Sequence, residues 1–461
     1  MPAALSHTAH AKALMALGLP LIGGHLAQFL IGATDTLMLG WYGVEALAAG
    51  VLAHSVFFVL FIMGTGFAWA VMPMVAAEAQ DATQVRRVTR MGLWLSMLFA
   101  AAVLPLMLFA ERPLLALGQP PEVAARAADY LAIAGWGLFP ALGVMVLKSY
   151  LAALERTQVV LWTTVIAALA NGAVNWVLIF GRYGFPELGV EGAAIASVVV
   201  QAVSLLVLVP YALRTFPEHE LFVRFWRADC GAFAAVFRLG WPIGLTSLAE
   251  VGLFSATAVM VGWLGAVPLA AHGIALQVAT AFFMVHLGLS NAATVRAGQQ
   301  LGRRDATGLA RGGAVALGLS VAVAGVTMVV YLALPEPMID LFLDPAEPAR
   351  PQIMALGVAL MAVAAAFQLV DGAQVVALGL LRGLQDTRVP MVYAALAYWG
   401  VGLPASYVAG FVLGLGAVGV WLGLVIGLAL AAVALLHRFW RVCLPALSWG
   451  ETPESGALAE S

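Results

Sequence analysis

Three carboxylates stand out because they fall inside long apolar stretches: Asp35, Glu250 and Asp371. A charged carboxylate in the bilayer interior costs about 2.5–3.5 kcal/mol on insertion scales, so each must be protonated, bind a cation or face water. Of the other 21 Asp and Glu residues, 20 fall in predicted loops or tails, and Asp129 falls in the first turn of the predicted helix at 127–153. These positions therefore suggest proton or metal-ion exchange. The structural alternative is a protonated acid that is hydrogen-bonded across a helix interface.

A second polar group lies in the first half of the chain. Asn171 and Asn175 are one helical turn apart, and Ser197 lies in the next predicted helix. Amide and hydroxyl oxygens are good ligands for hard cations, and Asp35 could complete such a set. Taken alone, these residues are explained equally well by hydrogen bonding between helices.

Two of the acids belong to an internal repeat. Residues 17–49 and 239–271 align without a gap at an offset of 222, and 12 of the 33 positions are identical. The alignment places Glu250 opposite Gln28, which lies two helical turns before Asp35 on the same helix face. In parallel repeats Asp35 should lie about 10 Å nearer the outside than Glu250. We therefore expect Gln28 to be a supporting polar residue of the site around Asp35.

Composition places these residues in a membrane. Of the 461 residues, 63% are hydrophobic and 10% are charged, whereas soluble domains contain about 25% charged residues. Charge-poor runs long enough to span a bilayer predict helices at 14–39, 46–75, 91–110, 127–153, 158–181, 192–213, 239–263, 268–295, 312–334, 352–381, 389–411 and 416–437. The predicted fold is an all-α polytopic membrane protein with twelve transmembrane helices.

Basic residues gather on one side of the predicted membrane. With the N-terminus in the cytoplasm, the inner segments hold 18 of the 22 Lys and Arg residues. This asymmetry predicts that both termini are cytoplasmic. Six helices per half make the repeats parallel, with an N-lobe over 1–225 and a C-lobe over 226–461. Lys148 and Arg296 are placed at cytoplasmic helix ends, so no basic partner is expected near the buried acids.

Signatures of other protein classes are missing from the sequence. It contains no GxxxxGK[ST], HExxH, GxSxG or CxxC motif, which argues against an enzyme and against transport driven by ATP. Cys230 and Cys443 are isolated, so neither a disulfide framework nor a metal cluster is expected. We expect no cofactor and no nucleic-acid partner.

At these residues the sequence resembles the multidrug and toxic compound extrusion (MATE) family, in its NorM-like bacterial branch. The matching motifs extend over nearly the whole chain: Asp35-Thr36 with Gly40 and Gly43, Gly240-Trp241-Pro242 through Glu250 and Phe254, Leu269 to His272, Ala293 to Gly298, Asp371 to Gln374, Leu381 to Gly383, Asp386-Thr387 and Pro390-Met391. The resemblance implies two six-helix lobes around a central cavity. It also implies drug efflux by alternating access, driven by Na+ or H+.

The resemblance also assigns roles to single residues. It implies that Asp35 is a cation-coupling residue of the first lobe, with Asn171, Asn175 and Ser197 as its polar neighbours. It implies that Glu250 and Asp371 form a cation site in the second lobe. Some relatives carry a Tyr one turn before the second of these acids, where this chain has Phe367.

We therefore expect a cation-coupled efflux antiporter for small organic cations and amphiphilic drugs. It would act as a monomer in the lipid bilayer of the bacterial cytoplasmic membrane. The candidate Na+ ligands are Asp35, Asn175, Glu250 and Asp371, and the same carboxylates could carry H+ instead. The first alternative is a flippase for lipid-linked oligosaccharide of related fold, which would need cationic residues in its cavity to meet phosphates. A channel or membrane receptor is the second alternative.

Overall fold

The computed structural model describes residues 6–345 and 347–447, and its regular elements there are helices. Within these residues, 12 helices are long and apolar enough to cross a membrane, which confirms the predicted number of spans. The predicted cytoplasmic termini at 1–5 and 448–461 lie outside the described residues. The chain is a polytopic membrane protein.

The helices follow one another in a regular order. The elements of the first half are α1 (His7–Tyr42), α2 (Val44–Ala77), α3 (Ala82–Leu108), α4 (Glu111–Ala116), α5 (Pro121–Ala153), α6 (Thr157–Phe180), α7 (Gly189–Thr215) and the short η1 (Pro217–His219). Those of the second half are α8 (Cys230–Trp263), α9 (Ala266–Gly302), α10 (Ala306–Ala333), α11 (Pro335–Asp340), α12 (Arg350–Gly383), α13 (Arg388–Ala395), η2 (Leu396–Gly402), α14 (Leu403–Tyr407), η3 (Val408–Val412), α15 (Gly416–His437), η4 (Arg438–Cys443) and α16 (Leu444–Ala446).

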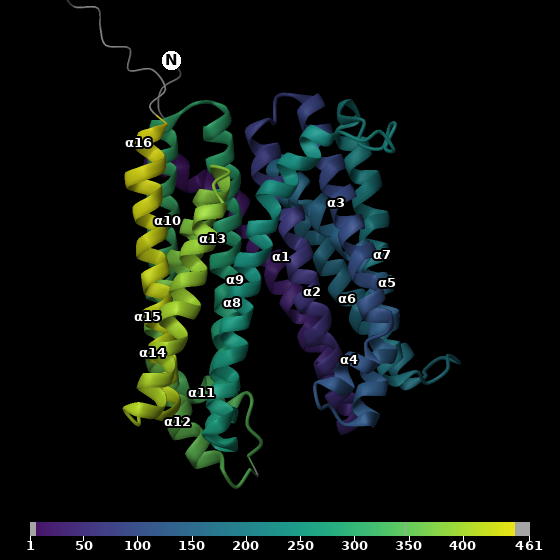
Figure 1. The fold of residues 1–461 in the computed structure, drawn as a ribbon, viewed down its shortest axis with the longest axis vertical. Helices are drawn as coiled ribbons and strands as arrows, with labels where there is room; N and C mark the ends of the chain where they lie inside the picture. The colour runs from purple at the N-terminus through teal and green to yellow at the C-terminus, as the bar shows by residue number, and fades with distance from the viewer. Residues whose placement is uncertain (1–5, 346, 448–461) are drawn as a thin grey trace, which may run out of the picture.

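The helices form two bundles that stand side by side (Figure 1). We call α1–α7 the N-lobe and α8–α16 the C-lobe. Both α1 and α8 start at the same end of the molecule, the upper end in Figure 1, so the two halves run in the same direction, as the repeat predicts. We call this end the basic end. The opposite end, which carries α4 and α11, is called the far end. The exact boundary at 225/226 stays a prediction.

Acidic caps start three helices at the basic end. Asp81, Asp229 and Asp305 each accept a hydrogen bond from a backbone N–H in the first turn of α3, α8 and α10. A carboxylate there satisfies a free N–H and offsets the positive end of the helix dipole. Asp229 also pairs with Arg87, which ties α3 of the N-lobe to the start of α8. These caps explain why acids mix with arginines in the loops of this end.

Arg90 fixes the connection between the two halves. Its side chain is 9% exposed, and its guanidinium donates to the carbonyl oxygens of Val223 at 2.6 Å and Arg224 at 3.2 Å. The Trp94 indole N–H donates to the carbonyl oxygen of Phe225 at 3.0 Å. Several charge-assisted bonds from one buried cation hold an irregular backbone more firmly than neutral bonds would. The connection is therefore packed on α3 instead of hanging free.

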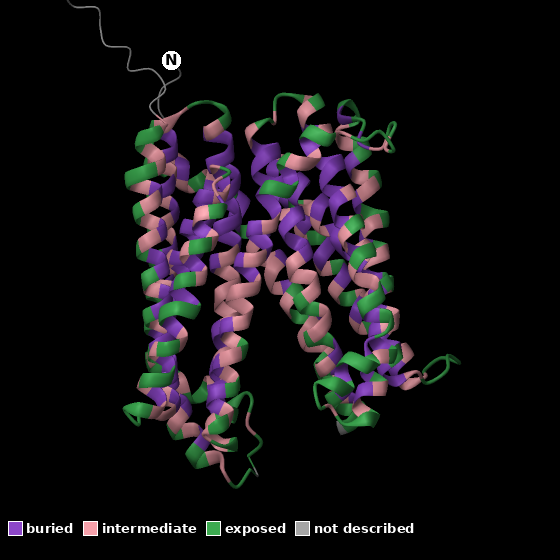
Figure 2. Cartoon of the chain, viewed as in Figure 1, coloured by how far each residue is buried: buried purple, intermediate pink, exposed green. Residues whose placement is uncertain are grey.

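The lobes meet through glycines of α2 and α8. A Cβ added to Gly66 would lie 2.5 Å from the carbonyl oxygen of Gly240, and one added to Gly244 would lie 2.6 Å from that of Met63. Only residues without a side chain let two helix backbones approach this closely. Toward the far end the bundles separate in Figure 1, and the facing helices α2 and α8 carry mostly intermediate and exposed residues there in Figure 2.

Three local features differ from the predicted spans. α3 begins at Ala82 instead of residue 91, because Asp81 caps it nine residues earlier. The far loops contain the short helices α4 and α11, which the apolar pattern did not predict. The predicted helix at 389–411 is not a continuous α-helix, since η2 and η3 within it are π-helical.

Candidate functional site

The N-lobe carboxylate lies in a polar cluster between α1 and α6. Asn175 donates from Nδ2 to Asp35 Oδ1 at 2.5 Å and to Asn171 Oδ1 at 3.2 Å. Both asparagines are fully buried, and their spacing of four residues puts them on one face of α6. The structure thus brings together three of the residues that the sequence singled out.

Tyr130 of α5 is a further member of this cluster that sequence reasoning missed. Its phenol lies close to Ser197 on α7 and within electrostatic range of Asp35. Ser197 therefore joins the cluster through Tyr130. Gln28 lies exposed on α1 and, in the described part of the chain, shares no hydrogen bond with these residues.

The asparagines leave two buried atoms free for a ligand. Among the described residues, Asn175 Oδ1 and Asn171 Nδ2 have no hydrogen-bond partner. Buried polar atoms are nearly always paired in native proteins, with water or an ion if not with protein. An acceptor oxygen beside a carboxylate suits a cation or a protonated water. The cluster can therefore hold a positive charge that Asp35 compensates.

The C-lobe site pairs two carboxylates. Glu250 of α8 and Asp371 of α12 lie within electrostatic range of each other and of the Tyr398 phenol. Asp371 is 2% exposed, and its Oδ1 has no partner among the described residues. Two carboxylates in one poorly solvated site cannot both stay charged without compensation. A proton or a cation must therefore accompany them.

The prediction that no basic residue lies near the buried acids is wrong. Arg382 lies within electrostatic range of Glu250, and its guanidinium stands over the Trp69 ring of α2, 5.6 Å from the ring centroid. The predicted span ended at residue 381 and left Arg382 in a loop, whereas α12 continues to Gly383. The last turn of α12 therefore carries a cation that touches the N-lobe and acts on the C-lobe acid.

A polar contact between α1 and α9 also crosses from one lobe to the other. His25 Nε2 and the Asn291 side-chain amide lie 2.9 Å apart. Lys148 of α5 lies within electrostatic range of His25. Lys148 lies five residues before Ala153, the last residue of α5, which agrees with the helix end expected for it.

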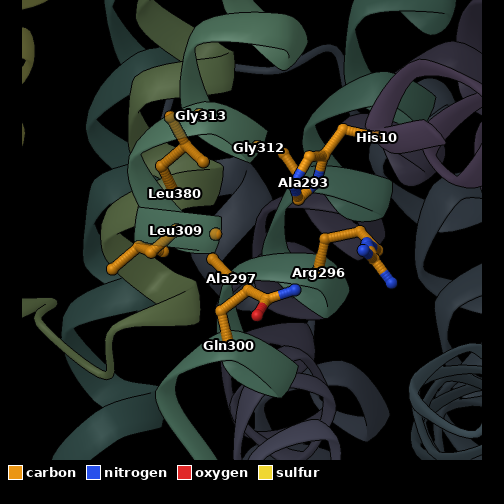
Figure 3. A pocket seen from close by; sticks show the side chains of 10 residues that line it. His10, Ala293, Arg296, Ala297, Gln300, Leu309, Gly312, Gly313 and Leu380 are labelled. Carbon is orange, nitrogen blue, oxygen red and sulfur yellow. The ribbon is translucent and has the colours of Figure 1, made fainter. Parts of the chain in front are cut away.

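Two cavities at the basic end lie apart from both carboxylate sites. The smaller has a volume of about 10 Å³, and His10, Arg296 and Gln300 line it together with α10 glycines (Figure 3). That space holds about one water molecule. The larger, of about 460 Å³, lies between the lobes and is lined by residues 76–81, Gln299 and others. Neither cavity is lined by any of the three membrane-embedded acids.

The fold and these sites define a class of protein: a two-lobed helical membrane protein with a carboxylate site in each lobe. The sequence profile of the MatE family matches residues 20–177 and 242–408, one block in each lobe. The chain belongs to the MatE family.

Curated relatives of bacterial origin match over nearly the full length. A protein from Rhizobium meliloti (strain 1021), named "Probable multidrug resistance protein NorM", is 47% identical over 438 residues, which cover 94% of each chain. A protein of the same name from Synechocystis sp. is 38% identical over 442 residues, covering 94% of this chain and 95% of that one. The resemblance to the NorM-like branch is thereby confirmed.

Solved structures share the fold at low sequence identity. The eukaryotic MATE transporter AtDTX14 superposes with a TM-score of 0.84 at 18% identity, covering 96% of this chain and 98% of that chain. A structure titled "Outward-facing conformation of a multidrug resistance MATE family transporter of the MOP superfamily" gives 0.86 at 20% identity, covering 96% and 97%. The predicted fold class, with two parallel six-helix repeats, is confirmed.

Proposed function

We propose that this protein is a multidrug efflux antiporter that exchanges Na+ or H+ for small organic cations and amphiphilic drugs. The observation that carries the proposal is a carboxylate site in each lobe, Asp35 in one and Glu250 with Asp371 in the other. The names of the relatives, which call them probable multidrug resistance proteins, support the same function. The flippase alternative gains no support from these names.

The lobe arrangement supports alternating access as the mechanism. The lobes are in backbone contact at Gly66 and Gly244, and they separate toward the far end. A drug that enters between the lobes would meet Asp35 or Glu250. A cation bound at the same carboxylate lowers its attraction for a positively charged drug. A bound cation or drug can shift the protein toward one opening only if it binds that conformation more tightly than the other.

The orientation belongs to the same proposal. We place the basic end in the cytoplasm of a bacterial cell and the far end outside the cytoplasmic membrane, because Lys and Arg favour the cytoplasmic side. The structure then corresponds to an outward-open arrangement. We also propose that one chain is the transporting unit, since both carboxylate sites lie within a single chain.

Ethidium efflux from proteoliposomes tests this function. A Na+ gradient and a pH gradient would be applied separately to wild type, Asp35→Asn, Glu250→Gln and Asp371→Asn. Efflux under Na+ that is lost in the C-lobe variants would place Na+ coupling there. Efflux under a pH gradient that is lost with Asp35→Asn would make Asp35 the proton carrier. No efflux under either gradient would contradict the proposal and favour the flippase alternative.

A further inference from the structure

Residues 216–229, which we call the connector, join α7 to α8 at the basic end. They lie on the outer side of the N-lobe, away from the C-lobe, at the upper right of Figure 1. Leu221 is 1% exposed, and Phe225 stacks on Trp94 of α3 with the ring centroids 6.0 Å apart. Together with the hydrogen bonds from Arg90 and Trp94, these contacts fix one side of the connector on α3. The opposite side faces the surroundings, and we call it the outward side.

The outward side carries two large apolar side chains. Trp226 is 77% exposed and Val223 is 53% exposed. The backbone N–H groups of Val223 and Arg227 close two turns on the carbonyl oxygens of Glu220 and Arg224, at 3.1 and 3.0 Å. Because these turns and α3 hold the backbone, both apolar side chains stay exposed instead of packing on the protein. Exposed Trp rings at the ends of membrane helices are typical of the membrane–water interface.

The length of α7 places the connector at the membrane surface. α7 is a candidate membrane span of 27 residues, Gly189–Thr215. At 1.5 Å per residue it is about 40 Å long. A bilayer with its headgroup regions is about 40–45 Å thick. The connector begins where α7 ends, so its outward side lies at the level of the lipid headgroups.

Two acids of the connector are already neutralised by α3. Glu220 pairs with Arg86 at 2.5 Å, and Asp229 pairs with Arg87. Glu218, the third acid, lies on η1 at the beginning of the connector. Most of the negative charge of the connector is therefore used within the protein.

The outward side keeps two positive charges. Arg224 precedes Trp226 by two residues, and Arg227 follows it directly. Both arginines are exposed, and neither forms an ion pair with another residue in the described part of the chain. Basic residues beside an exposed Trp favour an anionic lipid surface, since the ring enters the boundary of the acyl chains while the guanidinium binds headgroup phosphate.

We propose that the outward side of the connector binds anionic phospholipid in the leaflet at the basic end. Trp226 and Val223 enter the boundary between headgroups and acyl chains, and Arg224 and Arg227 donate hydrogen bonds to headgroup phosphates. The contact holds the link between the two lobes against the bilayer. It is separate from both carboxylate sites and does not depend on the proposed transport activity.

Fluorescence quenching in proteoliposomes tests this contact. The parent protein would carry Cys230→Ser, Cys443→Ser and Val223→Cys, labelled at residue 223 with the fluorophore NBD. Nitroxide-labelled phosphatidylglycerol or phosphatidylcholine would be added at the same low mole fraction. Both lipids should quench the label, and phosphatidylglycerol should quench it more. One arginine near an anionic surface changes the lipid preference about fivefold, so Arg224→Gln with Arg227→Gln should lower it by up to about 25-fold.

Matched variants separate a local contact from a general effect of charge. Arg303→Gln with Arg304→Gln removes the same charge from another exposed loop at the basic end and should leave the lipid preference unchanged. Trp226→Ala should weaken quenching by both lipids. Raising the salt concentration should reduce the preference in the parent protein without any substitution. Size-exclusion profiles would establish that each variant is folded.

Three results would overturn the proposal. Equal quenching by the two lipids in the parent protein would exclude recognition of the anionic headgroup. Quenching by iodide in the water phase, with none by either nitroxide lipid, would place the outward side away from the membrane. A preference that falls equally with the Arg303 and Arg304 substitutions would assign it to the overall charge of the basic end instead of to the connector.

Discussion

Replacing Gly244 by Ala should change which end of the protein is open. The added Cβ would lie 2.6 Å from the carbonyl oxygen of Met63 and 3.0 Å from its sulfur. The carbonyl belongs to the backbone of α2 and cannot rotate away, so the lobes must separate where they now touch. Overpacking of this kind costs about 1–3 kcal/mol. That cost applies only to the arrangement in which the basic ends are in contact.

The expected size of the effect follows from this cost. A bias of about 1–3 kcal/mol changes the ratio of two conformations by about 5- to 150-fold. Gly262→Ala is the matched control on the same helix, because its nearest neighbour would be 3.9 Å away, in ordinary van der Waals contact. Both substitutions give the same gain in helix propensity, about 1 kcal/mol. The difference between them isolates the contact between the lobes.

Pulsed electron paramagnetic resonance can measure the two populations. Spin labels at Tyr183 and Leu341, which are 85% and 82% exposed at the far end of the two lobes, would report the distance between them. The native Cys230 and Cys443 would first be replaced by Ser. In Gly244→Ala the population with the shorter far-end distance should rise, and in Gly262→Ala it should not. Identical distance distributions for Gly244→Ala and wild type would refute the reasoning.

Three further predictions concern single contacts. Asp35→Asn should abolish efflux while the protein still folds, because the amide keeps the shape but loses the charge; unchanged drug resistance at normal expression would exclude this role. Trp69→Leu should remove a cation–π contact with Arg382 worth about 0.5–2 kcal/mol. It should therefore shift the same spin-label distances in the direction of Gly244→Ala, and an unshifted distribution would count against the contact. The hydrogen bond from Arg87 holds the pKa of Asp229 below its ordinary value. Its stabilisation is therefore present above the unfolded-state pKa of about 3.9 and is lost as the pH falls through the lower folded-state value. The thermal midpoint of Asp229→Asn should accordingly lie below that of wild type at pH 7 and approach it as the pH falls below the unfolded-state value. A difference that stays constant with pH would contradict the ion pair.

The sequence predicts the spans well because bilayer thickness imposes a length that hydropathy can report. Twelve apolar runs correspond to twelve long helices, and the repeat at 17–49 and 239–271 gives their common direction. Helix ends are less predictable. α3 begins at Ala82, in a polar stretch where a cap matters more than hydropathy. The π-helical turns in 396–412 depend on how the helix packs on its neighbours, and no local sequence period encodes that packing.

Some residues of the candidate sites can be predicted from the sequence, and others cannot. Asp35, Glu250 and Asp371 are visible in the sequence because a carboxylate is rare in an apolar run. Tyr130 and Tyr398 are not, since an uncharged tyrosine does not stand out in an apolar run and only the packing of separate helices brings it to an acid. Gln374 carried a signal, as it falls in the motif that begins at Asp371, but its side-chain bond to the Tyr398 hydroxyl depends on how the following span packs on α12.

Competition between cation and drug is the central claim, and fluorescence of bound ethidium tests it most directly. Purified protein would be loaded with ethidium and titrated with NaCl at fixed pH, and then with acid at fixed Na+, using choline chloride to keep the ionic strength constant. Wild type should release ethidium with one of these cations, whereas the triple variant Asp35→Asn, Glu250→Gln, Asp371→Asn should not respond to either. Saturable ethidium binding in wild type that neither Na+ nor H+ displaces would contradict the claim.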